Sequence, residues 1–519
     1  MDRPFFYIGT AYVWTLWLLA LTGKAFALGL LIAAACLLAA ELVCLLRHKK
    51  TGIVPAVLFS CVLACSLFLI KTHFVLEPTL ALAGTRQQVS GTVTAVLKDS
   101  SSGNHRCIVD WNGTKVQLIS KTYVPGCGDR VSFRGKVYEL GEGDPDFQRY
   151  YRSTGTYISV FCYDSVSATP APQEQKTVRD RIEQFRQYLL DGVSHYLPEE
   201  LAGVLDGMLL GDKTLISEEQ QEWFRRSGIL HLFAVSGFHT SLWAMLLYRS
   251  LLKAGLGKRI SCWGGIAFTV FFMALTGFSK SGIRAGFMLL VFFLGKSFVL
   301  SVDSLNSLGF AGFLLCIGNP FAGGDSGLLL SYFATLGILS VYPILYKQLH
   351  RRFRDKKTVE RLLSTLALSA STFVFTLPVV MLTFGSVSLV SPISNLLITG
   401  VSSPAIILGG VGAVLNGIPG LQLLTPWCFL VAGEIVRYVN FSCRILSSWR
   451  FSYLAIDSPS LQLAAAGCLL LVALTLLFHY SLPKQDRIPA LQKGSLPRLT
   501  GLLCLVLFFG AALSYDLLK

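Results

Sequence analysis

The sequence has few charged side chains. Only 14% of its 519 residues are Asp, Glu, Lys or Arg, whereas 53% are hydrophobic, and the mean hydropathy is +0.57. A soluble protein of this length could not cover its surface with so little charge. The composition therefore excludes an ordinary soluble domain and predicts an α-helical polytopic membrane protein.

Acidic residues are the scarcer kind of charge, with 30 Asp and Glu against 45 Lys and Arg and a formal net charge of +15. Such an excess can indicate a nucleic-acid partner. Most of it lies in short loops between apolar runs, however, as the positive-inside rule predicts for any polytopic membrane protein. Net charge alone therefore says little about the substrate.

Motifs for metals and nucleotides are missing as well. The sequence has no Cys-x-x-Cys pair and no Gly-x-x-x-x-Gly-Lys-Ser/Thr loop, and its eight histidines are scattered. We therefore expect no metal, no cofactor and no ATP hydrolysis by this chain. Ten of the 13 cysteines lie in or beside apolar runs, where Cys acts as a small hydrophobe. Cys107, Cys127 and Cys162 lie in a polar insert, where two of them could form a disulfide, and the sequence does not select the pair.

About 13 apolar runs approach or reach the ~20 residues that a helical span needs. Several contain Pro or polar residues, so we expect about 10–13 membrane segments. The runs cover residues 5–22, 25–46, 53–70, 230–253, 260–278, 283–300, 305–317, 327–346, 362–384, 389–415, 421–446, 461–480 and 499–517.

The charged loops predict how the chain is oriented in a cytoplasmic membrane. The first run is not a cleaved signal peptide, because a second run follows at once without a small-residue cleavage site. The basic loop Arg47–Lys50 is expected in the cytoplasm. This places the N-terminus in the cytoplasm and residues 71–226 outside it.

The external segment begins with a β-rich insert. Five short alternating runs, separated by turn signals such as Asn112-Gly113, are expected to be strands. They cover residues 88–97, 106–111, 114–119, 130–138 and 156–163. Five strands in about 80 residues suit an OB-like β-barrel.

Aromatic and basic residues interleave in this insert. Trp111, Arg130, Arg134, Lys136 and Tyr138 have the chemistry of a single-strand nucleic-acid platform, on which rings stack with bases and cations meet phosphates. The alternative is an ordinary half-buried barrel whose aromatic residues form its core.

A Pro-rich linker at residues 169–172 follows the insert. Three amphipathic segments come next, at residues 178–197, 198–210 and 218–226, and we expect them to be helices lying at the membrane surface. A soluble helical hairpin is the alternative.

Polar residues interrupt the apolar runs of the second half, where they could line a conduit through the membrane. The alternative is that the charged ones lie at the interface and extend to water, and an ion pair between Arg284 and Asp325 is a further hypothesis. The candidate channel-lining residues are His231, Ser236, Gly237, His239, Arg284, Asp325, Ser331 and Asn395. Gly237 would let a helix bend or another backbone approach.

An enzymatic alternative rests on Ser236 and His239 as a serine and base pair. Three positions apart on one helix, they do not readily aim at each other with a substrate between them. We therefore expect no catalytic residue and no enzymatic activity, and keep a membrane-embedded hydrolase using Ser236 as an alternative. A transporter of a non-DNA solute is a third reading.

An ordered set of motifs resembles the ComEC family of competence proteins over nearly the whole chain. The set comprises Gly128–Val131, Asp146–Tyr151, Gly207–Lys213, His231–His239, Ser281–Ala285, Asp325–Tyr332, and Pro392 with Asn395. Long members of that family also carry a C-terminal metallo-β-lactamase-like domain. This sequence ends at Lys519 without a His-x-His-x-Asp-His motif, so it resembles a short form.

The resemblance implies passage of single-stranded DNA across the cytoplasmic membrane during natural transformation. It implies as partners single-stranded DNA and membrane lipids. It also implies a DNA receptor, a cytoplasmic ATPase or strand-binding proteins to supply direction, and a separate nuclease. We expect N-terminal transmembrane helices at residues 1–76 and an extracytoplasmic OB-like β-barrel domain at 77–168. Linker and amphipathic surface helices would occupy 169–227, and a competence-type transmembrane channel domain 228–519.

Overall fold

The computed structural model describes residues 3–46, 54–97, 103–126, 128–162, 166–170, 178–233, 237–299, 302–450 and 452–455. The chain divides into two compact units. The first unit contains Met1–Thr177 and Leu305–Leu328, and the second contains Val178–Ser304 and Leu329–Lys519. The four-part division expected from the sequence stays a prediction.

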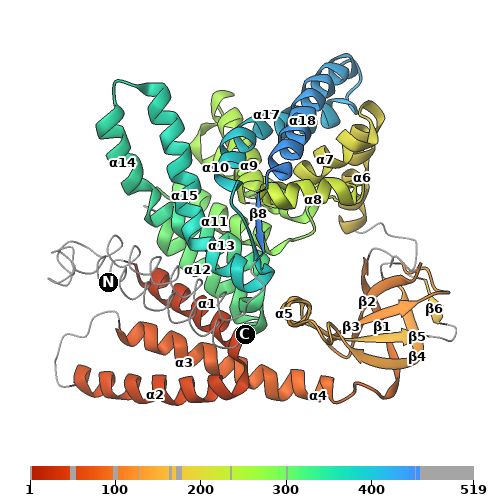
Figure 1. The fold of residues 1–519 in the computed structure, drawn as a ribbon. Coiled ribbons are helices and arrows are strands. Elements are labelled where there is room, and N and C mark those ends of the chain that lie inside the picture. The colour runs from red at the N-terminus through yellow and green to blue at the C-terminus, as the bar shows by residue number, and fades with distance from the viewer. Residues whose placement is uncertain are drawn as a thin grey trace. The chain divides into compact units, whose positions relative to one another are not determined.

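Apolar helices form one part of the first unit (Figure 1). Helices α1 (Pro4–Thr22) and α2 (Lys24–Leu46) pack against α3 (Val54–Lys71). The chain then continues through a π-helical turn, η1 (Thr72–Leu76), into the short helix α4 (Glu77–Leu80).

Two glycines let α12 (Ser304–Ile317) approach α1 closely. A Cβ atom on Gly9 would lie 1.9 Å from the backbone oxygen of Gly309, so neither position has room for a side chain. The carboxamide of Asn306 accepts a hydrogen bond from the backbone N–H of Phe6 at 3.1 Å, which satisfies a donor that the first turn of α1 leaves open.

A small β-barrel forms the other part of the first unit. Its strands are β1 (Arg86–Leu97), β2 (His105–Trp111), β3 (Thr114–Ser120), β4 (Arg130–Glu139), β5 (Thr156–Cys162) and β6 (Ser167–Thr169). The order is β1-β2-β3-β5-β4, and β4 pairs back with β1, so five strands close on themselves while β6 adds to β4. Valines at alternate positions, such as Val89, Val109 and Val160, fill the interior.

The five strands expected from the sequence begin and end within one or two residues of these boundaries. Alternation is a local pattern, and turn signals such as Asn112-Gly113 separate neighbouring runs, which explains the agreement. The structure thus confirms a small five-stranded barrel-like sheet. Its assignment to the OB-fold and its extracytoplasmic location stay predictions. The sequence reading missed α5 (Pro145–Thr154), which lies between β4 and β5.

The second unit is helical. Helices α9 (Gly237–Lys253), α10 (Gly257–Leu275) and α11 (Lys280–Ser297) pack against one another. Most of α13 (Ser326–Ser340) also belongs to this unit, and α14 (Tyr342–Phe353) forms a hairpin with α15 (Lys357–Phe384) (Figure 1). Further along the chain, α16 (Ser391–Ser394), the π-helical turn η4 (Asn395–Thr399) and α17 (Gly400–Leu415) run in succession, and α17 packs on α18 (Thr425–Ser448).

The core of the second unit is centred on α7 (Glu199–Leu210). Every residue from Leu201 to Leu210 is buried, and α6 (Val178–Tyr196), α17 and α18 pack around it. The three helices expected at residues 178–226 are present, with α8 at Glu218–Ser227. For α7, however, the expected position at a membrane surface is wrong. Leu201–Leu210 is apolar around its whole circumference apart from Asp206, and such a helix is buried in protein.

Among the described residues, six helical segments are long and apolar enough to cross a membrane: Pro4–Thr22, Val54–Leu80, Gly257–Leu275, Ser326–Phe353, Lys357–Phe384 and Ser391–Leu415. They support a multi-pass membrane protein. The runs expected at 461–480 and 499–517 lie outside the described residues.

Candidate functional site

The strand β4 carries four of the five candidate nucleic-acid-binding residues on one face. Arg130, Arg134 and Lys136 are exposed, and they alternate with buried residues such as Val131 and Phe133. This is the two-residue period of a strand with one face in the barrel core. Tyr138 continues the exposed row, and the Lys136 ammonium lies 5.3 Å from the centre of its ring.

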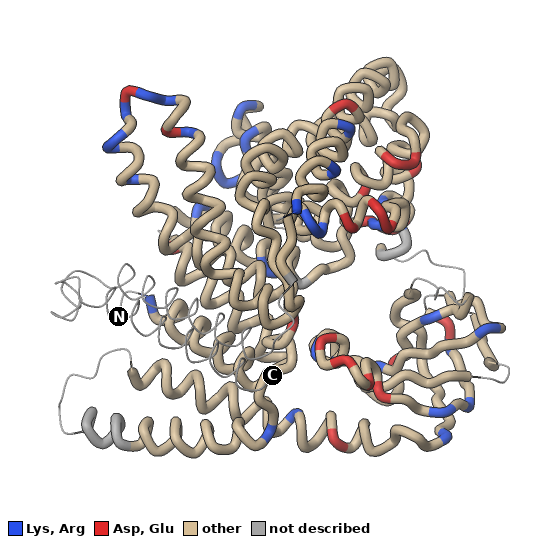
Figure 2. Tube along the Cα trace, in the orientation of Figure 1, with Lys and Arg blue, Asp and Glu red and all other residues tan. Residues whose placement is uncertain are grey.

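Pairing with β1 extends this row. Arg86 lies opposite Lys136, Gln88 opposite Arg134 and Ser90 opposite Ser132, whose hydroxyl is 2.9 Å away. We call this surface the β1–β4 outer face: Arg86, Gln88, Ser90, Thr92, Arg130, Ser132, Arg134, Lys136 and Tyr138. Figure 2 marks the Lys and Arg positions along the chain, including those of the barrel strands.

The four cations of the β1–β4 outer face are available to a ligand. In the part of the chain that the structure describes, Arg86, Arg130, Arg134 and Lys136 form no ion pair with an acidic side chain. Sequence reading missed Arg86. Its place two residues before the exposed Gln88 in an alternating run was the signal that could have found it.

Trp111 does not share this face. Asp110 lies opposite Thr92, an exposed residue of the β1–β4 outer face, so the next residue, Trp111, points to the other side of the sheet. The ring is half-buried at the end of the β2–β3 hairpin. Strand alternation therefore does not place Trp111 on the same face as Arg130, Arg134 and Lys136.

The loop that enters β4 is held by Asp129. Its carboxylate accepts hydrogen bonds from the Tyr123 hydroxyl at 2.5 Å and from the Gly126 N–H at 2.9 Å. Burial, together with this hydrogen bond to Asp129, raises the pKa of the Tyr123 phenol. Cys107 and Cys162 are buried in β2 and β5, and Cys107 carries a free thiol. Because Cys127 lies outside the described residues, a disulfide involving it stays a prediction.

Within the first unit, Asp325 connects α5 to the residues that begin α13. One carboxylate oxygen accepts from the Leu328 N–H at 2.8 Å at the start of α13, and the other accepts from the Ser153 hydroxyl at 3.1 Å. Asn319 donates to the backbone oxygens of Arg152 and Ser153 at 3.2 and 2.8 Å, at the C-terminal end of α5. These contacts give Asp325 a helix-capping and anchoring role. A channel-lining role for it stays a prediction.

A buried polar cluster surrounds Arg284 in the second unit. The Arg284 side chain is 4% exposed and donates to the hydroxyls of Ser331 at 2.5 Å and Thr335 at 2.8 Å. Ser281 lies 2.9 Å from the Ser331 hydroxyl, so α11 and α13 share one network. We call Ser281, Arg284, Ser331 and Thr335 the Arg284 cluster.

Gly237 faces the Arg284 cluster. A Cβ atom there would lie 3.0 Å from Cβ of Ala285 and 3.2 Å from Nη2 of Arg284. The structure therefore brings Gly237, Arg284 and Ser331 together, and a channel-lining role for them stays a prediction. The sequence analysis missed Thr335, one helical turn from Ser331, and included Ser281 only in the Ser281–Ala285 motif. Because Arg284 and Asp325 belong to different units, the ion pair expected between them stays a prediction.

The other candidate channel-lining residues do not belong to the Arg284 cluster. His231 is exposed in a 3₁₀ turn at Leu230–Phe233, and His239 is fully buried in the first turn of α9. Asn395 begins the π-helical turn η4, which ends at Thr399, five residues before Pro404, whose missing N–H weakens the helix there. Ser236 lies outside the described residues, and its role stays a prediction.

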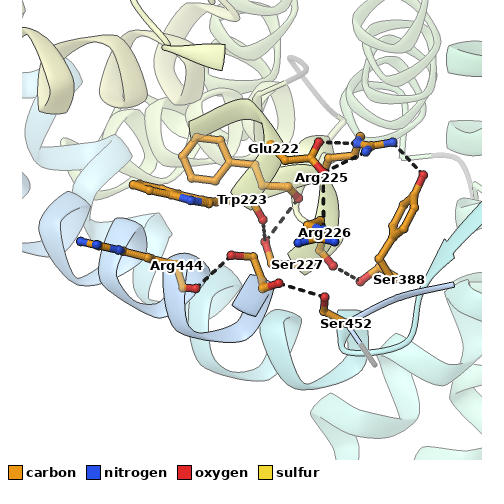
Figure 3. A network of polar contacts seen from close by, with 11 residues as sticks. Glu222, Trp223, Arg225, Arg226, Ser227, Ser388, Arg444 and Ser452 are labelled. Carbon is orange, nitrogen blue, oxygen red and sulfur yellow. Dashed lines mark hydrogen bonds and ion pairs between the residues drawn. The ribbon is translucent and has the colours of Figure 1, made fainter. Parts of the chain in front are cut away.

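A polar network fixes the segment that leads into the His231 turn (Figure 3). Glu222 forms a two-pronged ion pair with Arg225, at 2.7 and 2.9 Å, and Arg225 donates to the Tyr453 hydroxyl at 2.7 Å. Ser388 donates to the backbone oxygen of Arg226 at 2.7 Å. The network ties α8 to two short strands, β7 (Ser386–Ser388) and β8 (Tyr453–Ala455).

Gly228 ends α8 in the left-handed region with φ 76°. A Cβ atom there would lie 2.7 Å from Cβ of Ser391, so the turn requires glycine both for its backbone and for its space. This turn sets the direction in which the chain enters the His231 turn.

In the ranges described above, no group of three or more His, Cys, Asp or Glu side chains is gathered for a metal ion. The Arg284 cluster offers hydroxyls and a guanidinium, which bind anions rather than cations.

Comparisons with known proteins agree with the sequence resemblance. ComE operon protein 3 of Bacillus subtilis (strain 168) is 22% identical over 251 residues, 48% of this chain and 31% of that protein. An uncharacterized protein of Aquifex aeolicus (strain VF5) is 28% identical over 300 residues, 56% of this chain and 65% of that protein. The chain thus spans less than two thirds of the length of either relative. No solved structure matches it.

The family model described as Competence protein matches residues 208–480. The match begins in α7 and includes the His231 turn, Gly237, the Arg284 cluster and η4. This chain therefore belongs to the Competence protein family.

Proposed function

We propose that the chain takes part in DNA uptake and conducts single-stranded DNA across the cytoplasmic membrane. The proposal rests on the observation that the chain has two separate cationic features. One is the β1–β4 outer face, and the other is the buried guanidinium of the Arg284 cluster. Membership of the Competence protein family makes DNA the relevant polyanion.

The β1–β4 outer face suits an unpaired strand. Its β4 cations follow an extended strand that rises about 3.3–3.4 Å per residue, with Arg130 four residues before Arg134 and Lys136 two residues after it, so a phosphate backbone can run along them. Tyr138 adds an exposed ring beside Lys136, on which a base can stack. The four cations have no acidic partner among the described residues, so a phosphate does not have to displace one.

The Arg284 cluster suits a place that phosphates pass. A buried cation is costly unless something compensates its charge. Its described partners are the hydroxyls of Ser331 and Thr335 and the sulfur of Met288 at 3.7 Å, while Nε has no hydrogen-bond partner in this part of the chain. A transient anion would supply the missing charge. Hydroxyl partners hold the guanidinium in place without neutralising it.

The same proposal assigns no catalytic step to the chain. Direction would come from partner proteins, namely a cytoplasmic ATPase or strand-binding proteins. A DNA receptor outside and a separate nuclease would deliver the strand. In this proposal the N-terminus is cytoplasmic and residues 71–226, which include the barrel, face the outside.

A reconstituted system tests the proposal without those partners. Liposomes containing the full chain are loaded with a quenched fluorescent oligonucleotide, and its complementary strand is added outside. Annealing inside traps the strand and gives the signal. We expect transfer of the single strand but not of a duplex of the same length. Equal signals from empty liposomes, or from single strand and duplex, would contradict the proposal.

A further inference from the structure

An apolar cavity of about 330 Å³ lies in the second unit, separate from the Arg284 cluster. Five helices form its wall: α6, α7, α9, α10 and α17. Aromatic rings make up much of it, including Phe185, Trp243, Phe268 and Phe271. A cavity of this size with an apolar wall and few polar groups is typical of a small-molecule site.

Asp206 is the one ionisable side chain in this wall. It is 4% exposed, and its Oδ1 atom has no hydrogen-bond partner among the described residues. A buried carboxyl oxygen without a partner is unfavourable unless a ligand or a proton satisfies it. The carboxyl is therefore a feature that the packing of this core does not explain.

The neighbouring charges do not satisfy Asp206. Arg186 of α6 is the nearby cation, and its guanidinium donates to Asp212 at 3.0 Å, with Asp212 also accepting from the Thr214 N–H. Asp212 and Asp191 add negative charge near Asp206. The parts of α9, α10 and α17 that line the cavity contribute only uncharged side chains.

The pKa of Asp206 is raised to about 8, mainly by burial. The negative charges of Asp212 and Asp191 contribute to this rise, and the positive charge of Arg186 opposes it only in part. The carboxyl is therefore mostly protonated at pH 7. A protonated acid can ionise when a positive charge enters the cavity, and the released proton passes to solvent.

We propose that this cavity binds a lipophilic organic cation, with its charge on Asp206 and its apolar groups among the aromatic rings. The rings attract a cation through their faces, and the stacked arrangement of Phe268 and Phe272, with centroids 6.0 Å apart, presents such surfaces. An acyl chain would fill the same volume but leave Oδ1 unsatisfied. The inference is independent of DNA passage, since none of the residues in the cavity wall belongs to the β1–β4 outer face or the Arg284 cluster.

Tetraphenylphosphonium is a suitable probe, because its positive charge does not change with pH. Its binding to the purified full chain in detergent can be measured by calorimetry, with the neutral triphenylphosphine oxide as a control ligand. We expect D206N to weaken binding at least tenfold. Asn has nearly the same shape as the protonated acid, so the variant should fold. E183Q on the exposed face of α6, whose charge does not act on the Asp206 pKa, should change affinity less than twofold.

The pH dependence gives a second readout. Protons compete with the cation below the pKa of Asp206, so affinity should fall about 25-fold from pH 8.5 to pH 6.5 in the native chain and stay constant in D206N. Calorimetry in buffers of different ionisation enthalpy should show about 0.9 proton released for each cation bound at pH 7.

A third variant separates the rings from the acid. F271L keeps an apolar side chain but removes one ring. It should weaken binding of the cation several-fold and leave the pH dependence of binding intact. Equal affinity of D206N and the native chain would overturn the proposal. So would triphenylphosphine oxide binding as tightly as the cation, because that result would assign the cavity to neutral amphiphiles.

Discussion

The barrel and the helical unit treat charge in opposite ways. The β1–β4 outer face holds four cations in water, where each costs little and each is screened by salt. The second unit buries single ionisable groups, Arg284 at 4% exposure and Asp206 at 4%, where the charged form of each costs much and demands a partner. Many exposed cations suit reversible capture of a polyanion. A buried cation suits a step that selects which anion passes.

The largest effect expected from this contrast concerns Asp206. A carboxyl whose pKa is about 8 in the folded chain and about 4 when unfolded binds a proton more tightly in the folded state. The free energy of unfolding should therefore fall as pH rises between these values. From pH 5 to pH 8 the native chain should lose about 3–4 kcal/mol relative to D206N.

Thermal unfolding in detergent at both pH values measures this loss. The native chain should show a larger drop in melting temperature than D206N, whereas E183Q should behave like the native chain. If the melting temperatures of the native chain and D206N change equally with pH, the pKa of Asp206 is not raised in the folded chain.

Neutralising the exposed face should produce the next largest effect. The variant R86Q/R130Q/R134Q/K136Q removes four phosphate contacts, and each is worth about 0.7 in the slope of log affinity against log salt for a single strand. The slope should decrease in magnitude by about 3, and single-strand affinity at 0.1 M salt should fall by about two orders of magnitude. Fluorescence anisotropy with the full chain at several salt concentrations measures both.

A matched control uses the exposed Lys115 and Lys121 of β3 and the loop after it. Lys115 lies opposite Asp110, which offsets its charge. K115Q/K121Q should therefore change the slope by less than the four-residue variant does. A larger change in the slope for K115Q/K121Q would show that the strand binds at β3 and not at the β1–β4 outer face.

Removing the buried cation should act on passage and not on capture. R284M keeps an apolar side chain of similar length and eliminates the charge. We expect strand transfer into the loaded liposomes to fall tenfold or more, while single-strand binding stays within twofold. Loss of binding together with transfer would contradict the division of roles between the two regions.

R284K and the pair S331A/T335V serve as comparisons for R284M. The lysine keeps the charge and loses the two-hydroxyl geometry, so its defect should be smaller. Removing the two hydroxyls should cost about 1–3 kcal/mol of stability, because the guanidinium loses its described partners.

The smallest effects are expected for W111A and S236A. Trp111 points away from the β1–β4 outer face, so W111A should alter single-strand affinity less than twofold. A channel wall should tolerate S236A, whereas a hydrolase that uses Ser236 as its nucleophile would lose activity outright. Complete loss of DNA transfer in S236A would favour the enzymatic alternative.

The sequence by itself determined the local patterns. The two-residue alternation around Val131 and Phe133 located β4, and the runs of apolar residues located the helices, because these patterns depend only on neighbours along the chain. The motif order also sufficed for the family. Even α7 was found as a helix, and only its surroundings were mistaken.

Tertiary structure decided which distant residues meet. Strand pairing placed Arg86 opposite Lys136, helix packing brought Thr335 to Arg284, and the fold of five helices left Asp206 facing a cavity. Strand order, helix rotation and the volume left between side chains depend on contacts between segments tens of residues apart or more. No local pattern encodes those contacts, so the sequence analysis did not single out Asp206.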